Sequence, residues 1–157
     1  MKLRVFLTLL FGILMFSQQG VAQTKTKQKT QLVKYGKNVD APLTAKEMSM
    51  LKEVYQDKLN DYILNNKQKV KDFKHLLRNR IEIKQMPNIK DENKFTRLSS
   101  VELFDNYNSN LTRDKVFNKS TFNPLKYNLN FFIIGSSIYK IDNTNYYIII
   151  KSQTNRK

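Results

Sequence analysis

Apolar residues recur at every third or fourth position after Pro42, and this spacing predicts an amphipathic helix. Thr44 is a suitable N-cap, and Glu47, three residues later, completes the pattern of a capping box. Asn65 and Asn66 are expected to end the helix, because asparagine side chains compete for helical backbone hydrogen bonds. The predicted buried stripe consists of Met48, Leu51, Tyr55, Leu59, Tyr62 and Ile63.

A second helix is predicted over residues 67–79, where apolar residues again follow helical spacing. Its expected buried residues are Val70, Phe73, Leu76 and Leu77. The connection to the first helix is short, and a short connection favours antiparallel neighbours. We therefore expect the two helices to form a helix hairpin.

After this helix the pattern changes from helical to alternating. Residues 80–84 alternate as in a strand, which Pro87 stops. Residues 88–97 are polar and predict a loop. Residues 98–117 fit no single period, which indicates short helical or irregular structure.

Three runs near the C-terminus are rich in β-forming residues: 129–134, 138–142 and 146–151. Gly135-Ser136 separates the first two runs, and Asn143-Thr144-Asn145 separates the last two, as in tight hairpins. The expected fold is therefore α+β, with an N-terminal helix hairpin packed on a small, mainly antiparallel sheet. The sheet is expected to end in a three-stranded meander.

The run of residues 146–150 is apolar on both faces, which is unusual for a surface strand of a two-layer domain. Successive side chains point to opposite faces, so Tyr147 and Ile149 share one face. Either the strand is central and the chain itself covers both faces, or one face meets a partner. Apolar residues between 98 and 122 favour internal cover. Tyr147 and Ile149 are the partner-interface candidates if that cover is missing.

The first 22 residues have the layout of a secretory signal peptide. Two basic residues precede an apolar stretch of about a dozen residues, whereas a membrane span needs about 20. Gly20 and Ala22 place small residues before a cut at Gln23. An uncleaved membrane anchor is the alternative, and the short run disfavours it. We expect an exported protein, periplasmic or extracellular, with no membrane span after cleavage.

The mature chain divides into three predicted parts. Residues 23–38 carry five lysines and no acid, which predicts a flexible basic leader. Residues 39–153 have the length of a single α+β domain. Residues 154–157 form a polar tail.

The chain has 28 Lys and Arg residues against 13 Asp and Glu residues. Its formal net charge is +15, which removal of Lys2 and Arg4 lowers by two. Lysine supplies most of this charge, and a composition rich in Lys, Asn, Ile and Tyr is typical of A/T-rich coding. It favours loose association with an anionic polymer or an envelope protein and does not favour specific nucleic-acid binding.

The chain has no cysteine and one histidine, His75. These counts exclude Cys-based zinc sites, Cys–His dyads and multi-histidine metal centres. We therefore expect no cofactor and no metal. His75 lies off the apolar stripe of its helix, so we expect it to be exposed and not catalytic.

Two charged series lie on the predicted helices. Lys67, Lys71, Lys74 and Arg78 share one face of the second helix and form either an anion-binding stripe or a solvated flank. Glu53, Asp57 and Asp61 lie one turn apart on the first helix and can bind a hard cation or act as acid and base. Both series face away from the apolar stripes, so the solvated interpretation is favoured for each.

Between residues 104 and 132, aromatic residues alternate with asparagines. Glycan-binding surfaces combine these residue types. Ordinary cores also bury aromatic residues beside hydrogen-bonded amides, and the core interpretation is favoured here.

The chain resembles a family of small secreted proteins from flavobacteria and related Bacteroidota. The resemblance lies in the stretches APLTAKEMSMLKEVYQDKL, HLLRNRIEI, LSSVELFDNYN, FNPLKYNLNFF and DNTNYYIIIKSQ, and it covers about residues 39–153. It implies a location in the bacterial envelope, and it brings no activity, ligand or catalytic residue. Ala followed by Gln at the expected cut is also similar to signal peptides common in Bacteroidota.

Two classes of function follow from these observations. The favoured class is an exported non-enzymatic envelope protein with a partner-binding or structural role. The alternative is a small secreted enzyme of the hydrolase type that uses carboxylates, because glycosidase chemistry needs only two carboxyl groups. No G-x-S-x-G motif surrounds the serine pairs at 99–100 and 136–137, which disfavours a serine nucleophile. The sequence does not define the oligomeric state.

Overall fold

A computed structural model describes residues 35–133 and 135–153 of the chain. The predicted signal peptide at 1–22, most of the predicted leader at 23–38 and the predicted tail at 154–157 lie outside the described residues. Among the described residues, no helix combines the length and the apolar character that crossing a membrane requires.

The predicted capping box is confirmed at the start of helix α1 (Ala45–Tyr55). The Glu47 N–H donates to the Thr44 hydroxyl at 3.2 Å, and the Thr44 N–H donates to the Glu47 carboxylate at 2.8 Å. The expected length of this helix is wrong, because Gln56 has a positive φ of 45° and interrupts it. A 3-10 turn (Gln56–Lys58) and a π-helical segment (Asn60–Leu64) follow.

Helix α2 (Lys67–His75) begins where the asparagine pair was expected to separate the helices. The Asn66 side chain accepts hydrogen bonds from the N–H groups of Gln68 and Lys69 at 3.0 and 3.1 Å, which makes it the N-cap. The connection is itself helical and bent, and α2 lies against its Asn60–Leu64 segment, so the expected helix hairpin is not confirmed within the described residues. A π-helical turn (Leu76–Arg80) leads from α2 into the sheet.

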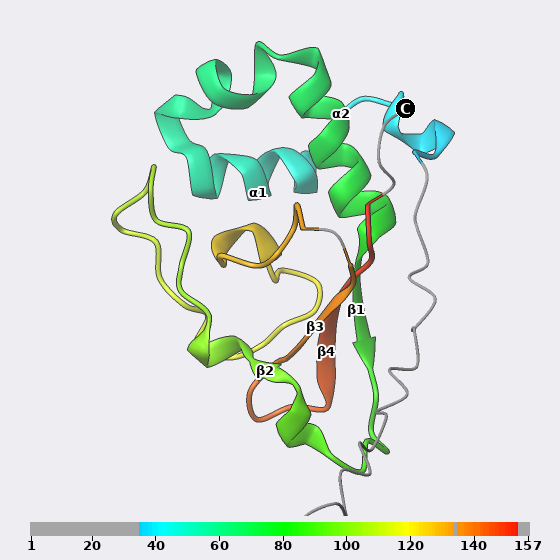
Figure 1. The fold of residues 1–157 in the computed structure, drawn as a ribbon. Coiled ribbons are helices and arrows are strands. Elements are labelled where there is room, and N and C mark those ends of the chain that lie inside the picture. Colours follow the sequence, from blue (N-terminus) through cyan, green and yellow to red (C-terminus); the bar gives the residue numbers. More distant parts are fainter. Residues whose placement is uncertain (1–34, 134, 154–157) are drawn as a thin grey trace, which may run out of the picture.

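The described sheet has four strands in the order β1-β4-β3-β2, which confirms a mixed α+β fold. Strand β4 is central and pairs antiparallel with both β1 and β3, whereas β2 pairs parallel with β3. In Figure 1 the helices lie at one end of the molecule, and the irregular chain before β3 lies between α1 and the sheet. The strands are β1 (Ile81–Gln85), β2 (Thr96–Arg97), β3 (Ser137–Lys140) and β4 (Tyr146–Ile150).

The expected three-stranded meander is wrong, because residues 129–133 form no strand. The Leu129 N–H donates to Tyr127 O and the Phe131 N–H donates to Leu129 O, both at 2.7 Å. These tight turns use donors that a sheet ladder would need. Tyr127 makes an isolated bridge to Leu103 instead. The side chains of Tyr127, Leu129 and Phe131 are buried, so the alternation that suggested a strand reflects burial without pairing.

Internal cover of β4 is confirmed for most of the strand. Ile148 and Ile150 are fully buried in the main core. Tyr147 is also fully buried, on the opposite face, where its ring meets that of Phe95 edge to face at 5.4 Å. Phe95 belongs to the predicted loop at 88–97, so that loop covers the Tyr147 face. The expected cover from residues 98–122 is confirmed on the other face, where Leu98, Val101 and Phe122 share the core with Ile148 and Ile150. Ile149 is half-buried.

Candidate functional site

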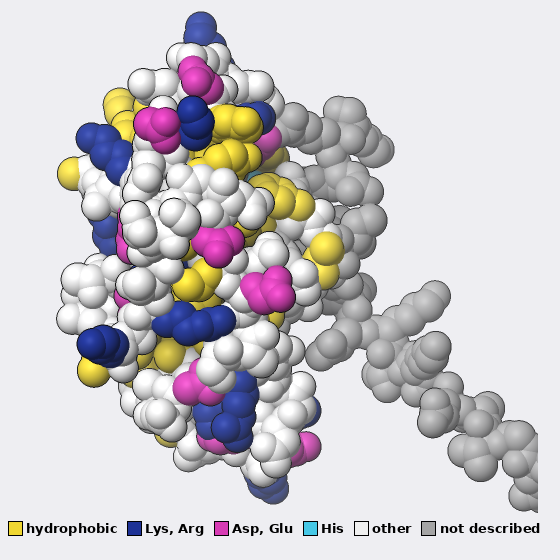
Figure 2. Space-filling model, turned by 90° about the vertical axis from the view of Figure 1, so that its left-hand side faces the viewer, with side chains coloured by type: hydrophobic (Ala, Val, Ile, Leu, Met, Phe, Trp, Pro, Cys, Tyr) yellow, Lys and Arg dark blue, Asp and Glu magenta, His cyan; other side chains and the backbone are white. Residues whose placement is uncertain are grey.

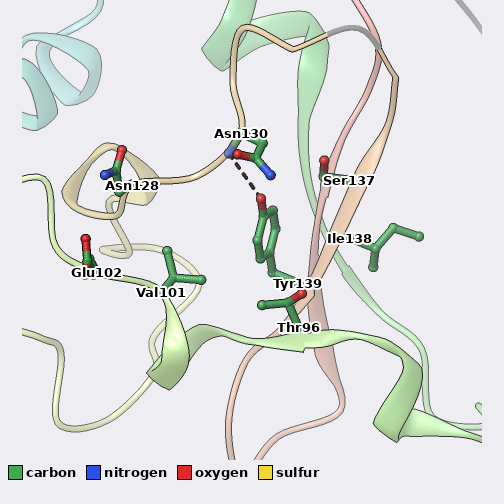
Figure 3. A pocket seen from close by; sticks show the side chains of 8 residues that line it. All are labelled: Thr96, Val101, Glu102, Asn128, Asn130, Ser137, Ile138 and Tyr139. Atoms are coloured by element: carbon green, nitrogen blue, oxygen red, sulfur yellow. Dashed lines mark hydrogen bonds between the residues drawn. The ribbon is translucent and has the colours of Figure 1, made fainter.

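A groove runs along the outer edge of β3, and its shape follows from the unequal lengths of two strands. β2 has two residues and pairs only with Tyr139 and Lys140, so it does not cover the edge at Ser137 and Ile138. The cavity beside this edge has a volume of about 460 Å³. We call it the β3-edge groove (Figure 3); its lining residues are Thr96, Val101, Glu102, Asn128, Asn130, Ser137, Ile138 and Tyr139.

The far wall of the groove is held by backbone hydrogen bonds between two irregular segments. The Asn128 N–H donates to Glu102 O at 2.8 Å, and the Phe104 N–H donates to Lys126 O at 2.8 Å. Tyr139 connects the two walls, because the Asn130 N–H donates to its hydroxyl oxygen at 3.1 Å. Figure 3 shows the Tyr139 ring standing between the strand side and the asparagine side.

The backbone of β3 presents a hydrogen-bonding group to this groove. The Ile141 N–H donates to Tyr146 O at 3.0 Å, so the polar groups of Ile141 and Tyr139 point toward β4. The backbone N–H and C=O groups of successive residues point to opposite edges of a strand. Those of Ile138 and Lys140 therefore point to the outer edge of β3. Lys140 lies beside β2, whereas Ile138 precedes the paired section. The N–H of Ile138 therefore faces the groove.

The groove is polar but carries little charge. Amides and hydroxyls line most of it, and Glu102, which is exposed, is the acid among its lining residues. Such groups can donate hydrogen bonds to a peptide backbone or another neutral polar ligand, and can accept hydrogen bonds from it. Within residues 35–133 and 135–153, no three His, Asp or Glu side chains converge in a way that could hold a metal ion.

The predicted basic stripe lies on α2 and on the π-helical turn that follows it, and it contacts the segment before α1. Arg78 donates to the Glu47 carboxylate and to the backbone oxygens of Asn38, Ala41 and Pro42. The hydrogen bond from Arg78 lowers the pKa of Glu47 despite the opposing effect of burial.

The other cations of the stripe differ in their surroundings. Lys74 is buried and donates to Ala41 O at 2.9 Å, and Lys71 pairs with Asp40 at 3.0 Å. Lys67 is exposed. Three of the four cations thus have partners within the chain, so neither a fully solvated flank nor a free anion site describes this face. On the face shown in Figure 2, basic and acidic side chains alternate and do not gather into one basic patch.

The carboxylates at Glu53, Asp57 and Asp61 do not share a site. The Glu53 carboxylate accepts from the Asn123 amide at 2.9 Å and lies 3.4 Å from the Lys126 ammonium, whereas Asp57 pairs with its neighbour Lys58. Asp61 is exposed. The first helix therefore gives no acid–base pair.

His75 is buried, so the expectation that it is exposed is wrong. Its ring stacks on the ring of Tyr35 with a centroid distance of 4.1 Å, and its Nδ1 lies 3.1 Å from the Asn79 amide. The cause is the chain before α1. Tyr35 belongs to the predicted flexible leader but stacks on His75, and the buried Val39 also lies against α2.

The remaining candidates are placed as follows. Tyr147 is fully buried, so of the two partner-interface candidates only Ile149 has exposed surface. The core interpretation of the aromatic and asparagine series is confirmed for Phe122, Tyr127 and Phe131, which are buried. The asparagines Asn128 and Asn130 of the same series are exposed and line the groove.

Comparison with known proteins identifies no relative of the chain. No protein-family model, no curated protein and no solved structure matches the chain.

Proposed function

We propose that the chain is an exported, non-enzymatic binding protein of the bacterial envelope, and that its β3-edge groove takes up an extended segment of a partner protein. The observation that carries this proposal is the shortness of β2, which leaves the edge at Ser137 and Ile138 beside the groove. An extended segment that joins a sheet edge gains main-chain hydrogen bonds, and pockets beside the edge select its side chains.

The composition of the groove favours a polypeptide over an anionic polymer. No lysine or arginine is among its lining residues, and Glu102 would repel an anion. Amide and hydroxyl groups match the donors and acceptors of a peptide backbone. The volume of about 460 Å³ lies within the usual range of ligand sites. A basic residue in the partner segment would complement Glu102.

The groove supports binding better than hydrolysis by two carboxylates. Hydrolysis of that kind needs an acid and a second carboxylate on opposite sides of the bond that breaks. Glu102 is the carboxylate among the residues that line the groove. Strand addition needs no second acid.

Export is the other half of the proposal, and the N-terminal sequence supports it. The layout of residues 1–22 and the resemblance to small secreted proteins of flavobacteria both favour a periplasmic or extracellular location. The intact mass of the protein purified from its native host tests this. We expect a chain that begins at Gln23, and a mass that includes residues 1–22 would contradict export by cleavage.

The binding half is tested with a displayed library of short random peptides. Selected peptides are measured against Ile138→Pro, which removes the outward N–H, and against Ile138→Val, which keeps it. Proline is tolerated on an edge strand when its nitrogen faces outward, and circular dichroism checks that the variant is folded. We expect about tenfold weaker binding to Ile138→Pro, which equals about 1.4 kcal/mol, and little change with Ile138→Val.

Two results would contradict strand addition. One is a set of peptides that bind folded Ile138→Pro as tightly as the parent protein. The other is a selection in which no peptide prefers the parent protein over Ile138→Pro. Glu102→Gln is the charge control, and we expect it to weaken only peptides that carry a basic residue.

A further inference from the structure

A second cavity lies between the helices and the segment that precedes β3, and aromatic rings form most of its wall. Its volume is about 160 Å³. Tyr55 of α1, Phe73 of α2 and Phe104 contribute one part of the lining, and Leu125, Leu129 and Phe132 contribute another. We call it the aromatic cavity. It is separate from the β3-edge groove, although Asn128 lines both.

The wall of the aromatic cavity is built from rings that hold one another in place. Tyr55 meets Phe73 edge to face at 5.9 Å and lies 6.0 Å from Phe104, and Tyr55 and Phe73 are buried. Because these three rings come from different parts of the chain, the shape of the cavity is fixed by tertiary packing. Burial also raises the pKa of Tyr55 to about 12, which indicates an environment of low polarity.

The cavity has an apolar mouth. The side chain of Phe132 is 66% exposed although it lines the cavity, and its ring meets that of the buried Phe131 edge to face at 6.3 Å. Ile133, the next residue, is 47% exposed. Large apolar side chains that remain exposed beside a pocket are typical of binding sites.

We propose that the aromatic cavity binds one neutral aromatic ring of about the size of a phenyl group. Apolar cavities of about 150 Å³ accept benzene and do not hold ordered water, because water needs several polar partners. Among the lining residues, the polar side-chain groups are the Asn128 amide and the hydroxyls of Tyr55 and Tyr127, and none carries a formal charge. A charged ring would lose its hydration there without gaining a partner.

Toluene and benzoate are the probes that test this proposal. The binding of each is followed through the NMR signals of the Leu125 and Leu129 methyl groups. We expect saturable shifts with toluene and at least tenfold weaker binding of benzoate. Toluene that moves neither methyl signal, or benzoate that binds as tightly as toluene, would overturn the proposal.

Variants locate the ring within the molecule. Leu129→Phe fills the cavity and is expected to weaken toluene binding at least tenfold. Overpacking can destabilise a core, so Phe132→Ala is the second variant, because its exposed side chain can be removed without unfolding the protein. We expect Phe132→Ala to weaken toluene binding about threefold or more. The control, Val116→Ala, also removes an exposed apolar side chain, and it should leave binding unchanged.

The ring can belong to a free small molecule or to a phenylalanine side chain of a polypeptide. N-acetylphenylalaninamide distinguishes the two sources: tighter binding than toluene assigns the ring to a polypeptide, and weaker binding assigns it to a free aromatic compound. Toluene binding that is unchanged in Phe132→Ala and in a folded Leu129→Phe would show that the cavity is not the site.

Discussion

The guanidinium of Arg78 contacts both oxygens of the Glu47 carboxylate, with Nε 2.6 Å from Oε1 and a terminal nitrogen 2.7 Å from Oε2. The same Oε2 accepts the N–H of Thr44 and so completes the capping box of α1. The Glu47 carboxylate therefore caps α1 and also attaches α1 to the π-helical turn that follows α2. The two side chains are only 11% and 13% exposed, so solvent screens this ion pair weakly.

Removing Arg78 is expected to destabilise the fold. Arg78→Met leaves the buried Glu47 carboxylate without its charged partner, so the free energy of unfolding should fall by about 3 kcal/mol. Lys71→Met is the matched control, because the pair of Lys71 with Asp40 is exposed and should contribute less than about 1 kcal/mol. Urea denaturation measures both variants. Equal losses in the two variants would contradict a structural role for the Arg78–Glu47 pair.

The same pair predicts a dependence of stability on pH. Arg78 holds the pKa of Glu47 below its ordinary value of 4.5. A carboxyl group with a lowered pKa in the folded state stabilises the protein above its unfolded pKa, and this contribution is lost as the pH falls through the folded pKa. The urea midpoint should therefore fall as the pH drops below about 4.5, and less steeply in Arg78→Met. Parallel pH profiles for the two proteins would argue against this assignment.

Arg80 is buried and holds the end of the sheet through backbone oxygens. Its Nε donates to Lys151 O at 2.9 Å, and a terminal nitrogen donates to Phe131 O at 2.6 Å. Burial lowers the pKa of Arg80.

Replacement of Arg80 should be costly even when the charge is kept. Lysine cannot reproduce two donors in a planar arrangement, so we expect Arg80→Lys to lower the free energy of unfolding by about 2–3 kcal/mol. Arg97→Lys is the control, because Arg97 is exposed. Thermal unfolding followed by circular dichroism compares them. An Arg80→Lys protein as stable as the control would show that the guanidinium geometry is unimportant.

The two faces of β4 should respond differently to a buried charge. Ile148 is fully buried, so Ile148→Asp should unfold the protein. Ile149 is half-buried between Glu82 of β1 and Ile138 of β3, so Ile149→Asp should leave a folded protein that is weaker by about 2 kcal/mol. Far-ultraviolet circular dichroism distinguishes the outcomes. An unfolded Ile149→Asp would mean that this face is covered as completely as the core.

Local signals explain which elements could be predicted from the sequence. The capping box at Thr44, the asparagine pair between the helices and the strands that became β1, β3 and β4 each depend on residues close together in the chain. The interruption of the first helix at Gln56 has no comparable signal, because glutamine rarely adopts a positive φ and tertiary packing must impose it. The sequence did not reveal the tight turns near Leu129, because apolar and polar residues alternate there as they would in a strand.

The candidate site could not be predicted, because it is built from four separate segments. Thr96 belongs to a two-residue strand within a predicted loop, Glu102 and Asn128 belong to irregular chain, and Ile138 lies on β3. Each residue type is common, and only the register of β2 against β3 reveals the open edge. The one available signal was the run of asparagines around Asn128 and Asn130, which are polar residues on a segment whose other face is buried.

Hydrogen exchange at the N–H of Ile138 tests strand addition most directly. The measurement compares the protein alone with the protein bound to a selected peptide. An added strand accepts this N–H, so its exchange should slow by about tenfold or more, whereas the Tyr139 N–H, which points toward β4, should change little. Unchanged exchange at Ile138 in the saturated complex would contradict strand addition at the β3-edge groove.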